Sequence, residues 1–200
     1  MSTPASTRQQ RRREATADRI VEAAGALFGE RGVQATKVAD ICARADVAHQ
    51  TFFNHFPTKQ DVVHELVRRG HDFLIEAIDG VLAEDADTGT RLARLFEAIH
   101  TSAAAVGPMH QDLVSETLRA GHEEKDLGDT RRLHRALEGL IRAGRARGDV
   151  TRKHAAEDLV ALVIGALSQL MLDWAHRPGF DIEQRSRRLA RLLADALAPR

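Results

Sequence analysis

A short segment near residue 50 carries side chains that could read the edges of DNA bases. Its polar residues can form hydrogen bonds and include no acid: His49, Gln50, Thr51 and Asn54. A side-chain amide can bond a base edge in the major groove, and a hydroxyl or an imidazole can bond a base or a phosphate. Phe52 and Phe56 are four residues apart, so both could bury the opposite face of a short helix. The pattern is therefore typical of a recognition helix.

This segment needs a second helix and a tight turn to present it. Apolar residues recur at helical spacing just before it, in the order Val38, Ile41, Cys42 and Ala45. Thr36 is a candidate N-cap for this preceding helix. About three residues, centred on Asp46, separate the two helices, which forces a sharp angle between their axes. Residues 36–57 are therefore predicted to form a helix-turn-helix, although an αα-hairpin in a helical bundle would give the same pattern.

Helical periodicity also runs through the rest of the chain. An apolar repeat that starts at Ile20 and ends at Phe28 predicts a first helix, which Gly32 would end. Thr58 and Asp61 have capping-box spacing at the start of a long helix that reaches about residue 82. Further helices are predicted at about 92–103, 109–120, 127–147, 153–176 and 182–197. The prediction is an all-α protein of about nine helices without strands.

Composition excludes several classes of protein. The 200 residues carry no net charge, so the whole molecule is not a polycation. A basic arm over residues 1–14 is expected to be disordered and could attract phosphates through Arg8, Arg11, Arg12 and Arg13. Cys42 is the only cysteine, so no intramolecular disulfide can form. The N-terminus lacks an apolar signal core, and the longest apolar stretch, 159–172, is shorter than the roughly 20 residues that span a bilayer. A cytoplasmic protein without membrane association is expected.

Several fixed-spacing motifs resemble one family. They are Ile20-x-x-Ala23-Ala24-x-x-Leu27-Phe28, Gly32, Thr36-x-Val38-x-x-Ile41, Ala45-x-Val47, Thr51-Phe52-Phe53-x-His55-Phe56-Pro57-Thr58-Lys59 and Val62. In this order they resemble the DNA-binding domain of the TetR family over about residues 15–73. The resemblance implies a DNA-binding domain at 15–75 and an effector-binding and dimerisation domain at 76–200. It further implies a homodimer that binds a palindromic operator, most simply as a repressor released by a small effector.

The resemblance also assigns contacts to DNA. Thr36 and Lys37 would lie near phosphates at the start of the second helix, and His55 and Lys59 would hold the DNA backbone. The groove would be faced by His49, Gln50, Thr51 and Asn54. Three departures from the family pattern leave the affinity open. Phe53 lacks the hydroxyl of the usual tyrosine, so only packing and van der Waals contact are expected. Asp46 replaces a turn glycine, and Ala48 replaces a capping Ser or Thr, at a cost of about 1 kcal/mol.

The second domain is expected to bind an effector and a second copy of the chain. An apolar pocket is predicted from Phe73, Phe96, Ile99, His100, Met109, Leu113, Glu116 and Trp174, which suits a hydrophobic effector. A helix that is apolar on all sides, near 159–172, must be buried all round, and a partner subunit is an economical way to bury it. The predicted dimer interface comprises Leu159, Val163, Leu167, Leu170, Met171, Leu189, Leu192 and Leu193.

Catalytic and metal-binding signatures are not found. The chain has no Gly-rich phosphate loop, no GxSxG and no HExxH motif, so no enzyme activity and no cofactor are predicted. Ten histidines are scattered along the sequence, and no metal site is predicted, although His100 and His110 could approach each other near a helix break. Two alternatives to the regulator are a helical interaction module with impaired DNA binding and a metal-binding helical bundle.

Overall fold

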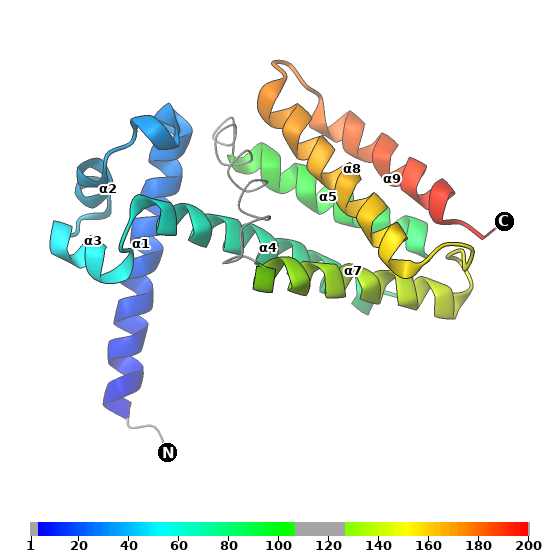
Figure 1. The fold of residues 1–200 in the computed structure, drawn as a ribbon, viewed down its shortest axis with the longest axis horizontal. Helices are drawn as coiled ribbons and strands as arrows, with labels where there is room; N and C mark the ends of the chain where they lie inside the picture. The colour runs from blue at the N-terminus through cyan, green and yellow to red at the C-terminus, as the bar shows by residue number, and fades with distance from the viewer. Residues whose placement is uncertain (1–3, 107–126, 200) are drawn as a thin grey trace.

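Two groups of packed helices make up the protein in the computed structural model, which describes residues 4–106 and 127–199 (Figure 1). Within these ranges there are eight α-helices and no strand, against about nine helices expected. The segment expected to form a helix at 109–120 lies outside the described residues. The helices are α1 (Pro4–Ala35), α2 (Val38–Ala45), α3 (His49–His55), α4 (Lys59–Ala83), α5 (Thr88–Val106), α7 (Leu127–Arg147), α8 (Ala156–His176) and α9 (Ile182–Leu197).

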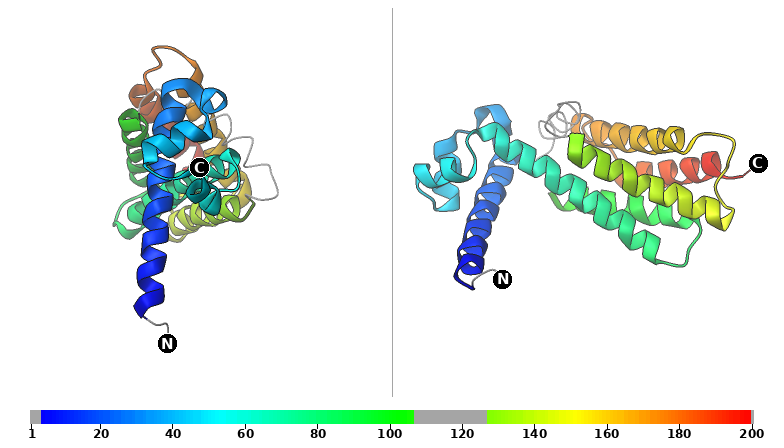
Figure 2. Two further views of the ribbon diagram at one scale, coloured as in Figure 1. Left: turned by 90° about the vertical axis from the view of Figure 1, so that its left-hand side faces the viewer. Right: turned by 60° about the horizontal axis from the view of Figure 1, so that its bottom comes forward.

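The first group packs α1, α2, α3 and the start of α4 around one apolar core. Its fully buried side chains include Ile20, Ile41, Phe52, Val62 and Val63. These are the positions that the helical repeats and the Phe52–Phe56 spacing predict to be apolar and inward-facing. The group lies apart from the remaining helices, with α2 and α3 on the side of α1 that faces away from them (Figures 1 and 2).

Helix α1 is longer than expected. It begins at Pro4, so residues 4–14, expected to be a disordered arm, are helical in this structure. The reason is local, since arginine, glutamine, glutamate and alanine all have high helix propensity. Side chains add support, because Gln10 donates to Glu14 at 3.2 Å. Near the other end, Gly32 adopts φ 82° and ψ 160°, which breaks the helix as expected before it resumes to Ala35.

Helix α4 belongs to both groups of helices. The predicted capping box starts it, because the Asp61 amide donates to Thr58 Oγ1 at 3.2 Å and the Thr58 amide donates to Asp61 Oδ2 at 2.9 Å. Val62 and Val63 at its beginning are buried in the first core. Ile78 and Val81 near its end are buried in the second. A single unbroken helix therefore connects the two cores.

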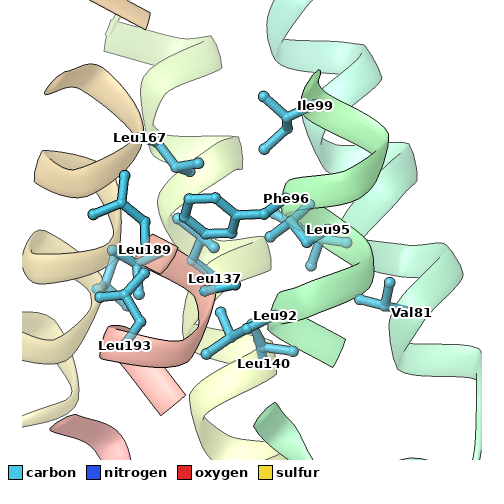
Figure 3. Packing of buried hydrophobic residues seen from close by; sticks show 14 of the residues in the cluster. Val81, Leu92, Leu95, Phe96, Ile99, Leu137, Leu140, Leu167, Leu189 and Leu193 are labelled. Carbon is cyan, nitrogen blue, oxygen red and sulfur yellow. The ribbon is translucent and has the colours of Figure 1, made fainter. Parts of the chain in front are cut away.

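The second group consists of α5, α7, α8, α9 and the later part of α4. Phe96 on α5 is fully buried among leucines from the neighbouring helices, with Leu137, Leu167 and Leu189 around it (Figure 3). Helix α5 packs on α9, and α4 packs on α7. This second core holds the larger share of the buried apolar side chains.

A chain of ion pairs crosses the surface between the two groups. It starts on α1, continues along α4 and ends on α7, through Asp18–Arg69 (2.5 Å), Arg69–Glu65 (3.0 Å), Glu65–Arg68 (2.6 Å), Arg68–Asp72 (2.5 Å) and Asp72–Arg132 (2.9 Å). The hydrogen bonds from Arg68 and Arg69 hold the pKa of Glu65 below its usual value. The chain of charges thus joins three helices that belong to different parts of the fold.

Helix α8 has the length and composition of a membrane-spanning helix, with 21 residues and a mean hydropathy of 1.5 in its most apolar window. The core helix of a water-soluble protein has the same properties, so one such helix is weak evidence for a membrane protein. Leu159, Val163 and Leu170 on this helix are buried in the second core, which accounts for much of its apolar character.

Candidate nucleic-acid interface

The turn between α2 and α3 adopts the tight geometry that a helix-turn-helix requires. Asp46 has φ 51° and ψ 56°, the left-handed conformation that glycine would adopt more easily. The Val47 amide donates to the Cys42 carbonyl at 3.0 Å and closes the end of α2. The aspartate at the usual glycine position is therefore accommodated without loss of the turn.

Helix α3 buries its aromatic side and exposes its polar side. Phe52 is fully buried and Phe56 is buried beside it, with ring centroids 6.1 Å apart. His49, Gln50 and Asn54 are exposed to solvent, and Thr51 is half-buried. The four predicted groove-facing side chains thus share one helix, and three of them are exposed.

Contacts along α3 order part of this exposed surface. Gln50 Nε2 donates to Asn54 Oδ1 at 3.1 Å, which holds the two amides side by side. Phe53 is 43% exposed, and its ring lies 5.8 Å from that of His49. Ala48 is the N-cap of this helix, and its methyl group supplies no capping hydrogen bond. The surface can therefore offer amide and imidazole groups to base edges, and an apolar ring beside them.

Thr36 lies inside the protein and not on the expected phosphate-facing surface. Its side chain is 1% exposed, and its hydroxyl donates to the carbonyls of Gly32 at 2.8 Å and Leu27 at 3.3 Å. Both hydrogen bonds tie Thr36 to the end of α1. Lys37, the next residue, is exposed and takes the N-cap position that was expected for Thr36.

Lys59 binds the end of α1. Its ammonium group donates to the carbonyls of Val33 at 2.6 Å and Thr36 at 2.9 Å, and more weakly to that of Gln34 at 3.5 Å. Lysine favours such a position because the carbonyls at a helix C-terminus carry partial negative charge. The predicted phosphate anchor thus also ties the start of α4 to the end of α1.

His55 lies at the end of α3 and is half-buried. Burial lowers the pKa of its imidazole, and the positive charge of Arg13 on α1 lowers that pKa further. The side chain therefore favours its neutral form in the folded protein. The effect of Arg13 also indicates that this part of α1 lies near the end of the recognition helix.

Two acidic side chains beside the helix-turn-helix are paired with arginines. Arg44 on α2 binds Glu30 at 2.5 Å, and Arg31 binds Asp40 at 3.0 Å. Paired acids repel a polyanion less than isolated ones do, because the neighbouring cation offsets their charge. These pairs also fasten α2 to the end of α1.

The predicted effector residues in the described part of the chain differ in how deeply they are buried. Phe96 and Ile99 are core residues, and His100 is half-buried with Nδ1 3.2 Å from the Phe96 carbonyl. Phe73 is 36% exposed on α4, whereas Trp174 packs against the second core. Met109, Leu113 and Glu116 lie outside the described residues. A separate surface groove of about 390 Å³ lies along α9 and is lined by Asp181, Glu183, Gln184, Arg187, Arg188 and Arg191.

Most of the predicted dimer residues are buried within a single protomer. Six lie in its own second core: Leu159, Val163, Leu167, Leu170, Leu189 and Leu193. Met171 is half-buried, and only Leu192, at 62% exposed, faces solvent. Leu162, which the sequence analysis did not select, is 46% exposed. The apolar helix α8 is therefore covered by its own protomer on one side and exposed on the other.

Other contacts at the interface could not be found from local patterns. The partners of Lys59 lie 23 to 26 residues earlier in the chain. Asp18 and Arg69 are 51 residues apart. By contrast, Glu65 and Arg68 are three residues apart and Arg68 and Asp72 are four apart, which is a recognisable signal for ion pairs along α4. No group of three metal-binding side chains is found among the described residues.

The fold combines an N-terminal helix-turn-helix with a second, larger helical part. Residues 20–66 match the family model described as bacterial regulatory proteins, tetR family. The chain is 35% identical over 79 residues to the HTH-type transcriptional repressor KstR2 of Mycobacterium tuberculosis, which covers 40% of each chain. The match thus spans less than half the length of this relative. The N-terminal part of the chain is thus similar to the DNA-binding domain of the tetR family.

Solved structures show the same fold over nearly the whole chain. The regulator FadR from Bacillus subtilis in complex with stearoyl-CoA has a TM-score of 0.76 and 21% identity, covering 90% of this chain and 98% of FadR. FadR from Thermus thermophilus in complex with lauroyl-CoA has a TM-score of 0.66 and 23% identity, covering 92% and 96%. The fold of the second part, which the family model does not reach, is therefore also that of these regulators.

Proposed function

We propose that the protein is a transcriptional repressor that binds a palindromic operator as a homodimer and is released by a small hydrophobic effector. The observation that carries the proposal is the exposed polar face of α3, where His49, Gln50 and Asn54 stand opposite the buried Phe52. A helix held in this way can enter the major groove with its hydrogen-bonding side chains toward the bases. Lys37 at the start of α2 would contact a phosphate.

The direct test is selection of a DNA site by the purified full-length protein. Duplexes from a randomised pool, and the DNA upstream of its own gene, are bound at moderate salt and measured by fluorescence anisotropy. Binding that survives an excess of mixed-sequence competitor is expected. Asn54→Ala on α3 should lose affinity for the selected duplex. Arg142→Ala, on the exposed side of α7, is the matched control and should keep that affinity. A folded dimer that selects no duplex would rule out the operator.

The dimer would use the solvent-facing sides of α8 and α9. These two helices pack on each other, and Leu162 and Leu192 leave apolar surface exposed on them. Burial of such surface against a second copy would stabilise a twofold-symmetric pair, which is what two half-sites require. Leu162→Glu and Leu192→Glu should each yield monomers in sedimentation velocity, whereas Arg142→Glu should not. Dimers that persist in both leucine variants would exclude this interface.

The effector would carry an apolar chain. Two of the matched regulators are solved with acyl-CoA thioesters, and the second part of this chain is rich in buried leucine and isoleucine. Phe73, His100 and Trp174 remain candidates for contacts with it, together with Met109, Leu113 and Glu116. Lauroyl-CoA and stearoyl-CoA are therefore the first probes, and release of bound DNA is the expected result. Unchanged DNA affinity at saturating amounts of both would count against an acyl-chain effector.

A further inference from the structure

The N-terminal turns of α1 form an exposed, basic helix that precedes the family domain. The family model starts at residue 20, and the first residue that packs against the first core is Ala17. Four arginines precede it in the described structure, all exposed: Arg8, Arg11, Arg12 and Arg13. The sequence up to Arg13 contains no acid. These turns are not needed to bury apolar surface, so the packing of the domain does not explain them.

This basic helix projects well beyond the core. From Arg8 to Ile20 an α-helix rises by about 18 Å, which equals about five base pairs of B-DNA at 3.4 Å each. Two orientations of the molecule show the N-terminal half of α1 extending away from the other helices (Figures 1 and 2). An element of this reach could contact a duplex outside the bases that α3 reads.

The first two acids that follow on α1 both accept hydrogen bonds or ion pairs. Glu14 accepts a hydrogen bond from Gln10, and Asp18 pairs with Arg69 on α4. The four arginines therefore dominate the charge of these turns. One of them, Arg13, lies near enough to α3 for its charge to act on His55. The C-terminal end of the basic helix is thus the part that lies nearer to the recognition helix.

We propose that residues 8–13 of α1 are a second DNA-contacting element, which binds phosphates flanking the half-site under α3. The inference rests on the proposed function, because it places the arm on the same duplex as the recognition helix. Charge complementarity favours this occupant, since a duplex carries one negative charge per about 1.7 Å of its axis. Contacts of this kind add affinity without reading sequence.

The test combines a change in the protein with a change in the DNA. Arg11→Gln/Arg12→Gln removes two charges and keeps helix propensity, because glutamine and arginine are similar helix formers. Arg135→Gln/Arg142→Gln removes two charges from the exposed side of α7 and is the matched control. The probes are a duplex that the wild-type protein selects from a randomised pool, with long flanks, and the same duplex trimmed by about five base pairs at each end.

The Arg11→Gln/Arg12→Gln protein, called the arm variant below, should bind the long duplex with an affinity that depends less on salt. The slope of log K against log[salt] changes by about 0.9 for each phosphate contact, so a dimer that loses four contacts should show a change of up to about 4. Trimming the duplex should lower the DNA affinity of the wild-type and control proteins but leave the DNA affinity of the arm variant unchanged. Circular dichroism checks that the helix content of the variant is kept.

Two results would overturn the proposal. The first is a salt slope for the arm variant that equals that of the wild type. The second is an equal loss of DNA affinity for the wild type and the arm variant when the duplex is trimmed. A wild-type protein that selects no duplex would contradict the proposed function instead. In that case the salt slopes are measured on a mixed-sequence duplex to test whether residues 8–13 contact DNA. Equal slopes for the arm variant and the wild type would exclude such a contact.

Discussion

Replacing Lys59 by methionine should destabilise the DNA-binding part as well as weaken DNA binding. The ammonium group makes two short hydrogen bonds, to Val33 and Thr36, at 2.6 and 2.9 Å. Hydrogen bonds to a charged group contribute about 1.5–3 kcal/mol each, and less where water reaches them. Since Lys59 is half-buried, we expect a total loss of about 2 kcal/mol in the free energy of unfolding.

Urea unfolding followed by circular dichroism measures this loss. With an m-value of about 2 kcal/mol/M, the midpoint should fall by about 1 M. The only tryptophan, Trp174, packs against the second core, so its fluorescence reports separately on the C-terminal part. If the midpoint followed by circular dichroism falls more than the midpoint followed by fluorescence, the loss of stability belongs to the N-terminal part.

Lys37→Met is the matched control because Lys37 is exposed at the start of α2. We expect this variant to lose DNA affinity with a change of less than about 0.5 kcal/mol in stability, as for most surface substitutions. Lys59→Met should differ from it in stability and resemble it in DNA affinity. If both variants unfold at the wild-type midpoint, Lys59 does not tie α4 to α1 and acts only as a surface charge.

Three further substitutions test other parts of the structure. Gln50→Ala should cost about 1–3 kcal/mol of discrimination at one base pair in competition with single-base variants of the operator, and unchanged discrimination would remove Gln50 from the reading surface. Gly144→Ala should cost about 1–3 kcal/mol in urea unfolding, because its Cβ would overlap the side chains of Thr88 and Val150; Gly139→Ala, whose Cβ would lie 3.8 Å from Leu82, is the tolerated control. The lowered pKa of His55 means that the unfolded chain binds more protons, so stability should fall as pH drops from 6.5 through the lower folded pKa. His55→Gln should remove this part of the pH dependence, and the exposed His134→Gln should leave it in place.

Local patterns predicted the elements that depend on near neighbours. The Phe52–Phe56 spacing and the Thr58–Asp61 capping box both appear in the structure as expected. Their geometry involves residues three or four positions apart, which a helix brings together whatever the rest of the fold does. The all-α class follows from the same periodicity.

Tertiary contacts and helix orientation could not be predicted in this way. Thr36 has a polar side chain in a position that suits an N-cap, yet the break at Gly32 places it in the core, where it bonds carbonyls of α1. Helix α8 is apolar on nearly all sides, so its periodicity does not indicate which side is buried. The neighbours Leu162 and Val163 are equally apolar, but the first is 46% and the second 1% exposed.

The unbroken course of α4 through both cores means that the two parts cannot be separated or exchanged at a linker. Each residue of a helix turns the chain by about 100° and advances it by about 1.5 Å. One residue inserted between Val67 and Ile78 would therefore rotate α3 by that angle relative to the second core. Seven inserted residues, close to two full turns, would nearly restore the rotation while moving the parts about 10 Å further apart. The mutual orientation of the reading surface and the second core is thus encoded in the number of residues along one helix.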